Sequence, residues 1–474
     1  MSENQEHNES VNTAVDAVVA RARKAQAEFE GLADQKLYDT AALAAGWAIM
    51  EEENNRMLAE MAVEATGLGN VPDKIIKNRR KTLGLLRDIK GVQTTGVSNE
   101  DPAKGITEIL RPVGVVGAVV PSTNPAATPA NNIINALKCG NAIILAPSPK
   151  GASVCRKLLE LIHANFKKAG INPDLVQSLP EPVSKAATSR LMATVDLLVV
   201  TGSQDNVRRA YSSGTPALGV GAGNVSVIVD ETADLKSAAE KITASKTFDN
   251  STSCSSENNL IILEAVYESC IQELCKAGAY LPEPAQAAEA AGRIRPDGRL
   301  NGALTGKGIG NVMQALGLPM PVGSAPKYVL LPTDDDSRGN PLCDEKMSLV
   351  VSVFKAADFQ HAQQIARRIF ACKGAGHSIG IHTNDYQRPV ELGKALPTCR
   401  VIVNQAHCFA TGGAFNNGMP FSLSMGCGSW GGNSIGENLH YKHFLNRTVI
   451  VRTIPEQVPS LDEIFEDYWR SFGR

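Results

Sequence analysis

The sequence predicts an α/β protein with two doubly wound lobes and a protruding β-extension. The chain has 474 residues, which is long for one simple core, so two or three lobes are expected. From Gly114 onwards, short apolar strands alternate with helical stretches, which is typical of a parallel sheet with helices on both faces. The pattern partly repeats after Cys254, and the repeat predicts the second lobe.

The elements of the first lobe follow from this alternation. Residues 8–66 are expected to be helical, and the valine and alanine stripe from Val11 to Val19 favours a first helix packed on the body over one docked on a partner. The expected strands are 114–120, 141–148, 195–203 and 224–230, with helices at 128–138, 151–168, 204–212 and 234–246. Ligands of such sheets bind at the carboxyl ends of the strands, here small polar loops.

The second lobe has its own set of predicted elements. Its expected strands are 258–264, 327–332, 348–354, 377–383 and 400–405. The region 409–438 is rich in Gly, Ser and Asn and predicts a long loop that closes over a site. Residues 444–454 are expected to form a strand and 460–472 a last helix. A protruding terminal strand often pairs with another subunit, so a homodimer or homotetramer is expected.

Charge and composition exclude several classes of function. The net charge of -2 carries no basic field for nucleic acid. Apolar runs such as Val113–Val120 are far shorter than a membrane span, and the polar start lacks the pattern of a secretory signal, so a cytoplasmic location is expected. The ten cysteines form no CxxC pair, and His440 and His443 lack a third ligand, so no metal is expected.

Cys254 is the sharpest signal for chemistry. A thiolate is a strong nucleophile, and polar surroundings rich in hydrogen-bond donors stabilise it. The hydroxyls near it belong to Ser251, Thr252, Ser253 and Ser255. The stretch is therefore interpreted as a nucleophile loop, and the alternative is a loop cysteine without a role.

Two further residues are candidates for the functional site, and each also has a simple structural explanation. Asn124 follows a strand and precedes a helix, so its amide is placed to face an oxyanion, although Asn-Pro turns are common. His377 lies between a glycine turn and a strand, where side chains face a cleft; alone it is more often structural. The glycines of 219–224 are interpreted as a turn rather than a dinucleotide fingerprint, because the strand follows them.

Together these stretches resemble the CoA-acylating branch of the aldehyde dehydrogenase superfamily, over about residues 10–455. The branch motif F-D-N-x-x-x-C-x-S-E is present at 248–257. The other matching stretches are TNP at 123–125, TGS at 201–203, GVGAGN at 219–224, DETAD at 230–234, EKMS at 345–348, GAGH at 374–377 and GCGSWGGNSIGEN at 426–438. Each is weak alone, but their order and spacing are specific.

The resemblance implies a domain plan and a set of site residues. Residues 1–244 would bind the nicotinamide cofactor and carry a β-extension near 98–112, residues 245–435 would carry Cys254, and residues 436–474 would serve oligomerisation. It implies Cys254 as nucleophile, Asn124 with the Cys254 backbone N–H as the oxyanion site, and His377 as a group that deprotonates a thiol or orients the site. The implied cofactor-binding residues are Ser122, Thr123, Pro147, Thr201, Gly202, Ser203, Gly219, Gly221 and Glu345, the last on the nicotinamide ribose.

Two departures from the hydrolytic relatives matter. Their E-L-G-G-K glutamate, which activates water, is replaced by glycine in the stretch Gly219–Gly223. Loss of that general base costs roughly 10²–10⁴ in the rate of water attack, whereas a thiol needs less help, so the resemblance implies coenzyme A as acyl acceptor. The lysine of their K-P-S-E stretch is replaced by alanine in the stretch Ala146–Pro149. The choice between NAD and NADP as cofactor is therefore left open.

The expected partners are a small-molecule aldehyde and coenzyme A. Sulfoacetaldehyde is the favoured aldehyde and succinate semialdehyde the alternative; a hydrolytic dehydrogenase and a non-catalytic protein of the same fold are the rival functions. An anionic substrate needs a cationic or donor-rich pocket. Arg111, Arg208, Arg209, the Asn416-Asn417 loop and the serines beside Cys254 are candidates, although surface placement is favoured for the arginines.

Overall fold

The computed structural model describes residues 3–323 and 325–474. Residues 1–2, which begin the stretch interpreted as lacking a secretory signal, lie outside the described residues. The helices are α1 (Glu3–Leu32), α2 (Gln35–Met50), α3 (Glu52–Thr66), α4 (Val71–Ile89), α5 (Ala127–Lys138), α6 (Ala152–Ala169), α7 (Lys185–Thr194), α8 (Gln204–Tyr211), α9 (Leu235–Thr247), α10 (Tyr267–Ala277), α11 (Pro284–Gly292), α12 (Ile309–Leu316), α13 (Phe359–Cys372), α14 (Arg388–Ala395), α15 (His407–Ala410) and α16 (Leu461–Phe472).

The strands fall into three sheets, with the orders β1-β2-β15, β5-β4-β3-β6-β7 and β10-β11-β12-β9-β8-β13-β14. Their bounds are β1 (Gly96–Asp101), β2 (Ile106–Pro112), β3 (Val115–Val120), β4 (Ala142–Pro147), β5 (Val176–Ser178), β6 (Leu197–Val200), β7 (Ala217–Gly219), β8 (Val225–Val229), β9 (Glu257–Leu263), β10 (Ala279–Tyr280), β11 (Tyr328–Pro332), β12 (Val350–Ala356), β13 (Ile379–His382), β14 (Val401–Val403) and β15 (Leu445–Val451). The α/β class and both doubly wound lobes are as predicted.

The first lobe is built on the five-stranded parallel sheet. Every residue of β3, β4 and β6 is buried, as expected for apolar strands covered by helices on both faces. The chain adds β4 and β5 on one side of β3 and then β6 and β7 on the other, so the direction of winding switches beside β3. Val15, Val18 and Val19 of α1 are buried in this core, which confirms the packed interpretation of the first helix.

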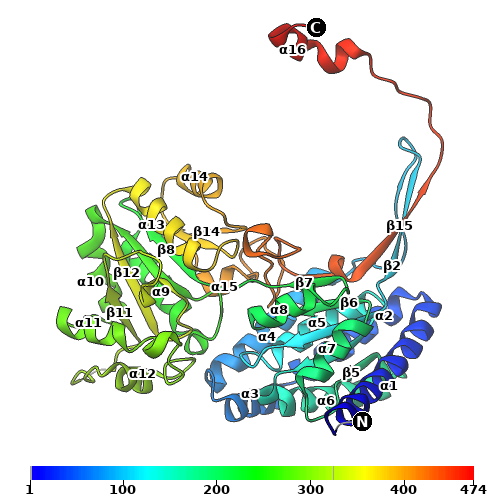
Figure 1. The fold of residues 1–474 in the computed structure, drawn as a ribbon, viewed down its shortest axis with the longest axis horizontal. Coiled ribbons are helices and arrows are strands. Elements are labelled where there is room, and N and C mark those ends of the chain that lie inside the picture. Colours follow the sequence, from blue (N-terminus) through cyan, green and yellow to red (C-terminus); the bar gives the residue numbers. More distant parts are fainter. Residues whose placement is uncertain (1–2, 324) are drawn as a thin grey trace.

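The second lobe corrects two predictions. The strand expected at 224–230 is present as β8, but it pairs with β9 and β13 of the seven-stranded sheet rather than with the first sheet. A boundary at residue 244 also falls inside α9, whose Ile242 packs in the core of the second lobe. The first sheet ends at Gly219, so the chain crosses between lobes between Gly219 and Val225. Figure 1 shows the two lobes side by side.

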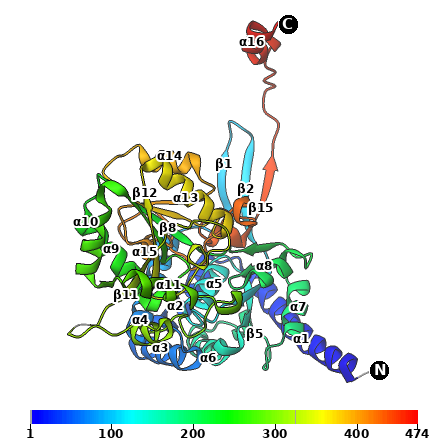
Figure 2. The same ribbon diagram turned by 60° about the vertical axis from the view of Figure 1, so that its left-hand side comes forward.

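A β-extension leaves the body, as predicted near 98–112. β1 and β2 form a hairpin, and β15 pairs antiparallel with β2 from Leu445 to Val451. The chain then runs without regular structure to α16, which stands far from both lobes in two views (Figures 1 and 2). Within the described residues, no helix combines the length and the apolar character that crossing a bilayer would require.

Candidate active site

The candidate site lies between the two lobes. It is bordered by the carboxyl ends of the strands of the first sheet and by the amino-terminal edge of the second sheet. The loops after β3 and β6 stand at the carboxyl ends of the first sheet, next to the point where its winding switches. Cys254, His377 and Glu345 each precede a strand of the second sheet, namely β9, β13 and β12. These strands are parallel and connected through the same sheet, so the three residues share its amino-terminal edge. Residues that lie between 32 and 123 positions apart in the sequence are thereby brought to one edge of the sheet.

Cys254 and His377 contact each other directly. His377 Nε2 lies 3.4 Å from Cys254 Sγ, and His377 Nδ1 lies 2.7 Å from the Ser378 hydroxyl oxygen. Arg400 donates to the backbone carbonyls of His377 and Gly426, each at 2.9 Å, and so ties the histidine to the loop 409–438. That loop reaches the site as predicted, since its Ser424 hydroxyl is also 2.6 Å from Thr201 Oγ1 of the first lobe.

The thiol is protonated more firmly than the polar sequence suggested. Burial raises the pKa of Cys254 to about 11, and the carboxylate charge of Glu345 acts in the same direction. Two of the neighbouring hydroxyls are used inside the protein, because Ser251 donates to Ser256 Oγ and Thr252 donates to Asp249. The expectation that these hydroxyls form a thiolate-stabilising shell is therefore wrong for Ser251 and Thr252. Burial also lowers the pKa of His377 to about 3, so the histidine is neutral at pH 7 and suited to accept a hydrogen bond from the thiol.

These shifts set the pH dependence of alkylation. Because the Cys254 pKa is about 11, the thiolate fraction is small at pH 7 and grows with pH up to that value. We expect the rate of iodoacetamide labelling at Cys254, measured by peptide mass spectrometry in the free protein, to rise about tenfold per pH unit between pH 7 and 10. A plateau already reached near pH 7 would contradict this assignment. Cys254→Ala identifies the labelled peptide.

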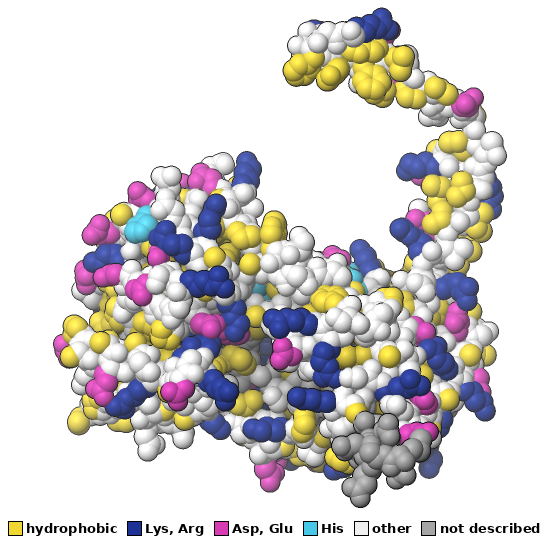
Figure 3. All heavy atoms as spheres, viewed as in Figure 1, with side chains coloured by type: hydrophobic (Ala, Val, Ile, Leu, Met, Phe, Trp, Pro, Cys, Tyr) yellow, Lys and Arg dark blue, Asp and Glu magenta, His cyan; other side chains and the backbone are white. Residues whose placement is uncertain are grey.

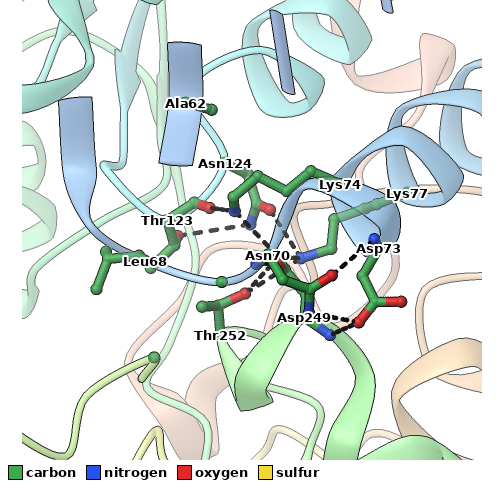
Figure 4. Close-up of polar contacts among 12 residues, drawn as sticks. Ala62, Leu68, Asn70, Asp73, Lys74, Lys77, Thr123, Asn124, Asp249 and Thr252 are labelled. Carbon is green, nitrogen blue, oxygen red and sulfur yellow. Dashed lines mark hydrogen bonds and ion pairs between the residues drawn. The ribbon is translucent and has the colours of Figure 1, made fainter. Parts of the chain in front are cut away.

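The loop before Cys254 has an unusual backbone. Asp249, Asn250 and Ser251 have φ values of 50°, 51° and 61°, a left-handed conformation that is costly for residues with side chains. The Asp249 carboxylate holds the loop against α4 by accepting from Lys74 at 3.1 Å and Lys77 at 2.5 Å (Figure 4). Burial acts to raise the pKa of Asp249, but the two lysine charges outweigh it and lower the pKa below its ordinary value.

The same helix orients Asn124. Lys77 Nζ donates to Asn124 Oδ1 at 3.0 Å and to Thr252 Oγ1 at 3.2 Å, as Figure 4 shows. With its oxygen on Lys77, the amide turns its Nδ2 the other way, where the described residues offer only the Thr123 hydroxyl at 3.5 Å. Among these residues the Cys254 backbone N–H also has no carbonyl acceptor. Both donors suit an oxyanion.

The predicted cofactor-binding residues gather at the carboxyl edge of the first sheet. Ser122 and Thr123 follow β3, Pro147 ends β4, and Thr201, Gly202 and Ser203 follow β6. The hydroxyl of Ser148, directly after β4, is buried and has no hydrogen-bond partner among the described residues, so the edge fits a polar ligand. Glu345 lies in the second lobe, before β12, 3.5 Å from Lys373 Nζ, and burial raises its pKa to about 7.

The glycine stretch before β8 explains why no glutamate stands there. A Cβ on Gly219 would lie 2.6 Å from Val207 Cγ1 and 2.9 Å from the Tyr211 hydroxyl oxygen. A Cβ on Gly221 would lie 2.5 Å from Cys427 Sγ, and one on Gly223 would lie 2.1 Å from the Cys254 carbonyl oxygen. The space beside this stretch is thus already filled. The stretch runs from the end of β7 to β8 and so connects two strands of different sheets.

The structure also places several polar residues that were candidates for binding an anionic substrate. Arg111 pairs with Glu30, Arg208 pairs with Asp205, and Arg209 donates to a backbone carbonyl and a serine, all on the surface of the first lobe. The Asn417 amide is occupied by its own loop and by Gln405. These groups are not in the site.

Two other features were missed. Lys77, Arg80 and Lys81 of the basic run on α4 line the site, although in sequence such a run is typical of a solvated helix face. His440 and His443 do have a third neighbour, because Glu437 lies 3.0 Å from His443 Nε2, and the three side chains come close enough to share an ion.

Comparison with known proteins places the chain in a family. Residues 4–289 match the aldehyde dehydrogenase family, and the chain belongs to it. It is 53% identical over 461 residues to the sulfoacetaldehyde dehydrogenase (acylating) of Cupriavidus necator, covering 97% of this chain and 93% of that protein. The predicted family is thereby confirmed.

Solved structures agree with this assignment. An acetylating aldehyde dehydrogenase from Geobacillus thermoglucosidasius matches with a TM-score of 0.90 at 31% identity, covering 96% of this chain and 99% of that one. A propionaldehyde dehydrogenase from Rhodopseudomonas palustris, solved with bound CoA and an acylated cysteine, matches with a TM-score of 0.82 at 26% identity, covering 92% and 97%. The predicted fold is confirmed.

Proposed function

We propose that the protein is a CoA-acylating aldehyde dehydrogenase that converts sulfoacetaldehyde, CoA and NAD(P)⁺ to sulfoacetyl-CoA and NAD(P)H. The observation that carries the proposal is the Cys254–His377 contact at 3.4 Å in a cleft between the lobes. The similarity to the acylating sulfoacetaldehyde dehydrogenase of Cupriavidus necator supports the substrate. Succinate semialdehyde is the second candidate aldehyde.

The first half of the reaction oxidises the aldehyde on the cysteine. Cys254 Sγ bonds to the aldehyde carbon, and its proton passes through the contact with His377 to solvent. The Asn124 amide and the Cys254 backbone N–H stabilise the oxyanion that forms. A nicotinamide cofactor, when bound, supplies the hydride acceptor, and loss of hydride leaves a thioester on Cys254. Ser122, Thr123, Pro147, Thr201, Gly202, Ser203, Gly219, Gly221 and Glu345 are the residues proposed to hold that cofactor.

The second half transfers the acyl group to another sulfur. The CoA thiol attacks the thioester carbon and gives its proton up through His377, and the oxyanion site is used again. Cys254 then leaves as thiolate and takes up that proton, which restores the thiol. Water competes poorly because Gly219 supplies no base and its surroundings leave no room for one. The His377 side chain, neutral at pH 7, is available to hydrogen-bond the incoming thiol.

The dependence on CoA tests this function. Without CoA, we expect NAD(P)H formation to stop after about one turnover per Cys254, because the thioester persists, with free acid formed at least about 100-fold more slowly than acyl-CoA. Stopped-flow absorbance and mass spectrometry of the product measure both. Equal rates of acid formation with and without CoA would establish the hydrolytic function instead. A panel with succinate semialdehyde and propionaldehyde, each with NAD⁺ and NADP⁺, identifies the preferred aldehyde and cofactor.

The protein is further proposed to form a homo-oligomer and to be located in the cytoplasm. The outer faces of β15 and α16 carry exposed apolar side chains, visible along the arm in Figure 3, and nothing in the described chain covers them. The side chains are Val449, Ile450, Val451, Leu461, Ile464, Phe465, Tyr468 and Phe472. An isolated 12-residue helix is marginal in water, so a second subunit is the expected support. Light scattering that gives a monomer mass would contradict this.

The cytoplasmic location is supported by the cysteines. All ten are free thiols, as is typical of a reducing compartment. Fractionation of cells that produce the full chain, with recovery outside the cytoplasmic fraction, would overturn it.

A further inference from the structure

One face of α4 gathers cationic side chains over the candidate site. Lys77, Arg80 and Lys81 are spaced i, i+3 and i+4, so they project from the same side of the helix. Together they line a small pocket whose other walls include Asn124 and Ser253. Ser253 is the chain neighbour of Cys254, so this pocket adjoins both the nucleophile loop and the proposed oxyanion donor.

Two of the three cations are committed to the protein. Lys77 donates to Asp249, Asn124 and Thr252. Lys81 donates to the Gly412 carbonyl at 2.5 Å, and burial lowers its pKa to about 7, so its charge is partly lost at neutral pH. Neither lysine ammonium is therefore well placed to bind an anionic ligand.

Arg80 differs from both lysines. Its guanidinium carbon lies 5.1 Å from the centre of the Phe409 ring and 5.6 Å from that of Phe415. Among the residues that the structure describes, its N–H groups have no hydrogen-bond or ion-pair partner. A guanidinium held by aromatic faces keeps its edge free for an anion.

The size of the proposed substrate places its anionic group in this pocket. In sulfoacetaldehyde one methylene separates the sulfonate from the aldehyde carbon. With that carbon at Cys254 and its oxygen at Asn124, the sulfonate is close to the pocket that Asn124 and Ser253 line. We propose that Arg80 binds this sulfonate and so determines the preference for an anionic aldehyde, an inference that rests on the proposed function.

Substrate selectivity tests the inference. The measurement is kcat/KM for sulfoacetaldehyde and for uncharged propionaldehyde, with CoA and NAD(P)⁺ saturating, in the wild type and in Arg80→Gln. We expect the ratio of the two values to fall roughly 10- to 100-fold in the variant, because a charge-assisted hydrogen bond is lost only for the sulfonate. Arg80→Met, whose stem still packs on Phe409, should give the same fall, and Arg80→Lys should recover part of the ratio.

The control is Arg79→Gln, which removes an exposed arginine from the adjacent position of the same helix and should leave the ratio unchanged. A thermal melt of each variant shows that it is folded. A ratio that stays constant in Arg80→Gln and Arg80→Met would overturn the role of Arg80 while leaving the function intact. A wild type that oxidises propionaldehyde but not sulfoacetaldehyde would overturn the proposed function, and the role of Arg80 with it.

Discussion

Replacing Cys254 by alanine is expected to abolish acyl transfer. The substitution removes the sulfur atom that is proposed to form the thioester, and loss of a catalytic nucleophile typically costs roughly 10⁴–10⁶ in kcat. The cavity left by one sulfur is small, and Gly223 continues to pack against the residue 254 backbone. We therefore expect the variant to fold and to bind NAD(P)⁺ with unchanged affinity, as measured by calorimetry.

Intact-mass spectrometry gives the most direct evidence for this role. Wild-type protein incubated with aldehyde and NAD(P)⁺, but without CoA, should gain the mass of one acyl group, and Cys254→Ala should gain none. Cys372→Ala is the matched control, because Cys372 is also a partly exposed thiol of the second lobe but lies at the end of α13. Acyl-CoA formation by Cys254→Ala above the uncatalysed rate would remove the basis of the mechanism.

Most of the fold could be predicted because its strands are apolar and separated by amphipathic helices. The sheet to which a strand belongs could not be predicted in the same way. β8 is fully buried, like β3 and β6, and apolar except for Ser226, and only its pairing with β9 and β13 assigns it to the second sheet. The three-residue strands β5 and β7 are too short to give a periodic signal.

The candidate site was predicted where the sequence motif itself carries the chemistry. Cys254, Asn124 and His377 stand in family motifs, and the structure brings them to one cleft; their individual roles remain proposals. What the sequence could not supply is the direction in which a polar side chain faces. The hydroxyls of Ser251 and Thr252 face inward, and three of the basic residues of α4 line the site. Both outcomes depend on tertiary packing, which the local composition of the sequence does not predict.

Lys77→Met is expected to reduce kcat by roughly 10²–10³, about the cost of losing one oxyanion donor, although Lys77 itself does not reach the aldehyde. Lys77 donates to Asn124 Oδ1, and this bond decides which way the amide faces. Without it, the amide rotates freely, and its Nδ2 is no longer fixed toward the oxyanion. Asn124→Ala should therefore lower kcat by a similar factor, and the double variant should be no slower than Asn124→Ala alone.

Lys74→Met separates this effect from simple loss of stability. Lys74 also pairs with Asp249, at 3.1 Å, and donates to the Thr123 carbonyl, but it does not contact the Asn124 amide. Removing either lysine leaves the buried carboxylate with one cation, which costs less in the free energy of unfolding than the roughly 3–5 kcal/mol of a buried charge with no partner. We expect urea denaturation to show similar destabilisation in both variants and kinetics to show the large loss of kcat only in Lys77→Met. Equal losses of kcat would make Lys77 a structural residue only.

The acid sensitivity of these variants follows from the same carboxylate. The folded-state pKa of Asp249 lies below its ordinary value, so its ion pairs stabilise the protein above that ordinary pKa, and this contribution is lost as the pH falls through the lowered value. Each lysine charge that is removed brings the Asp249 pKa back up, because burial then opposes ionisation with less compensation. Acid unfolding of Lys74→Met and Lys77→Met, followed by circular dichroism, should therefore begin at a higher pH than in the wild type. The left-handed turn at Asp249–Ser251 depends on this carboxylate, and the position of Cys254 depends on that turn.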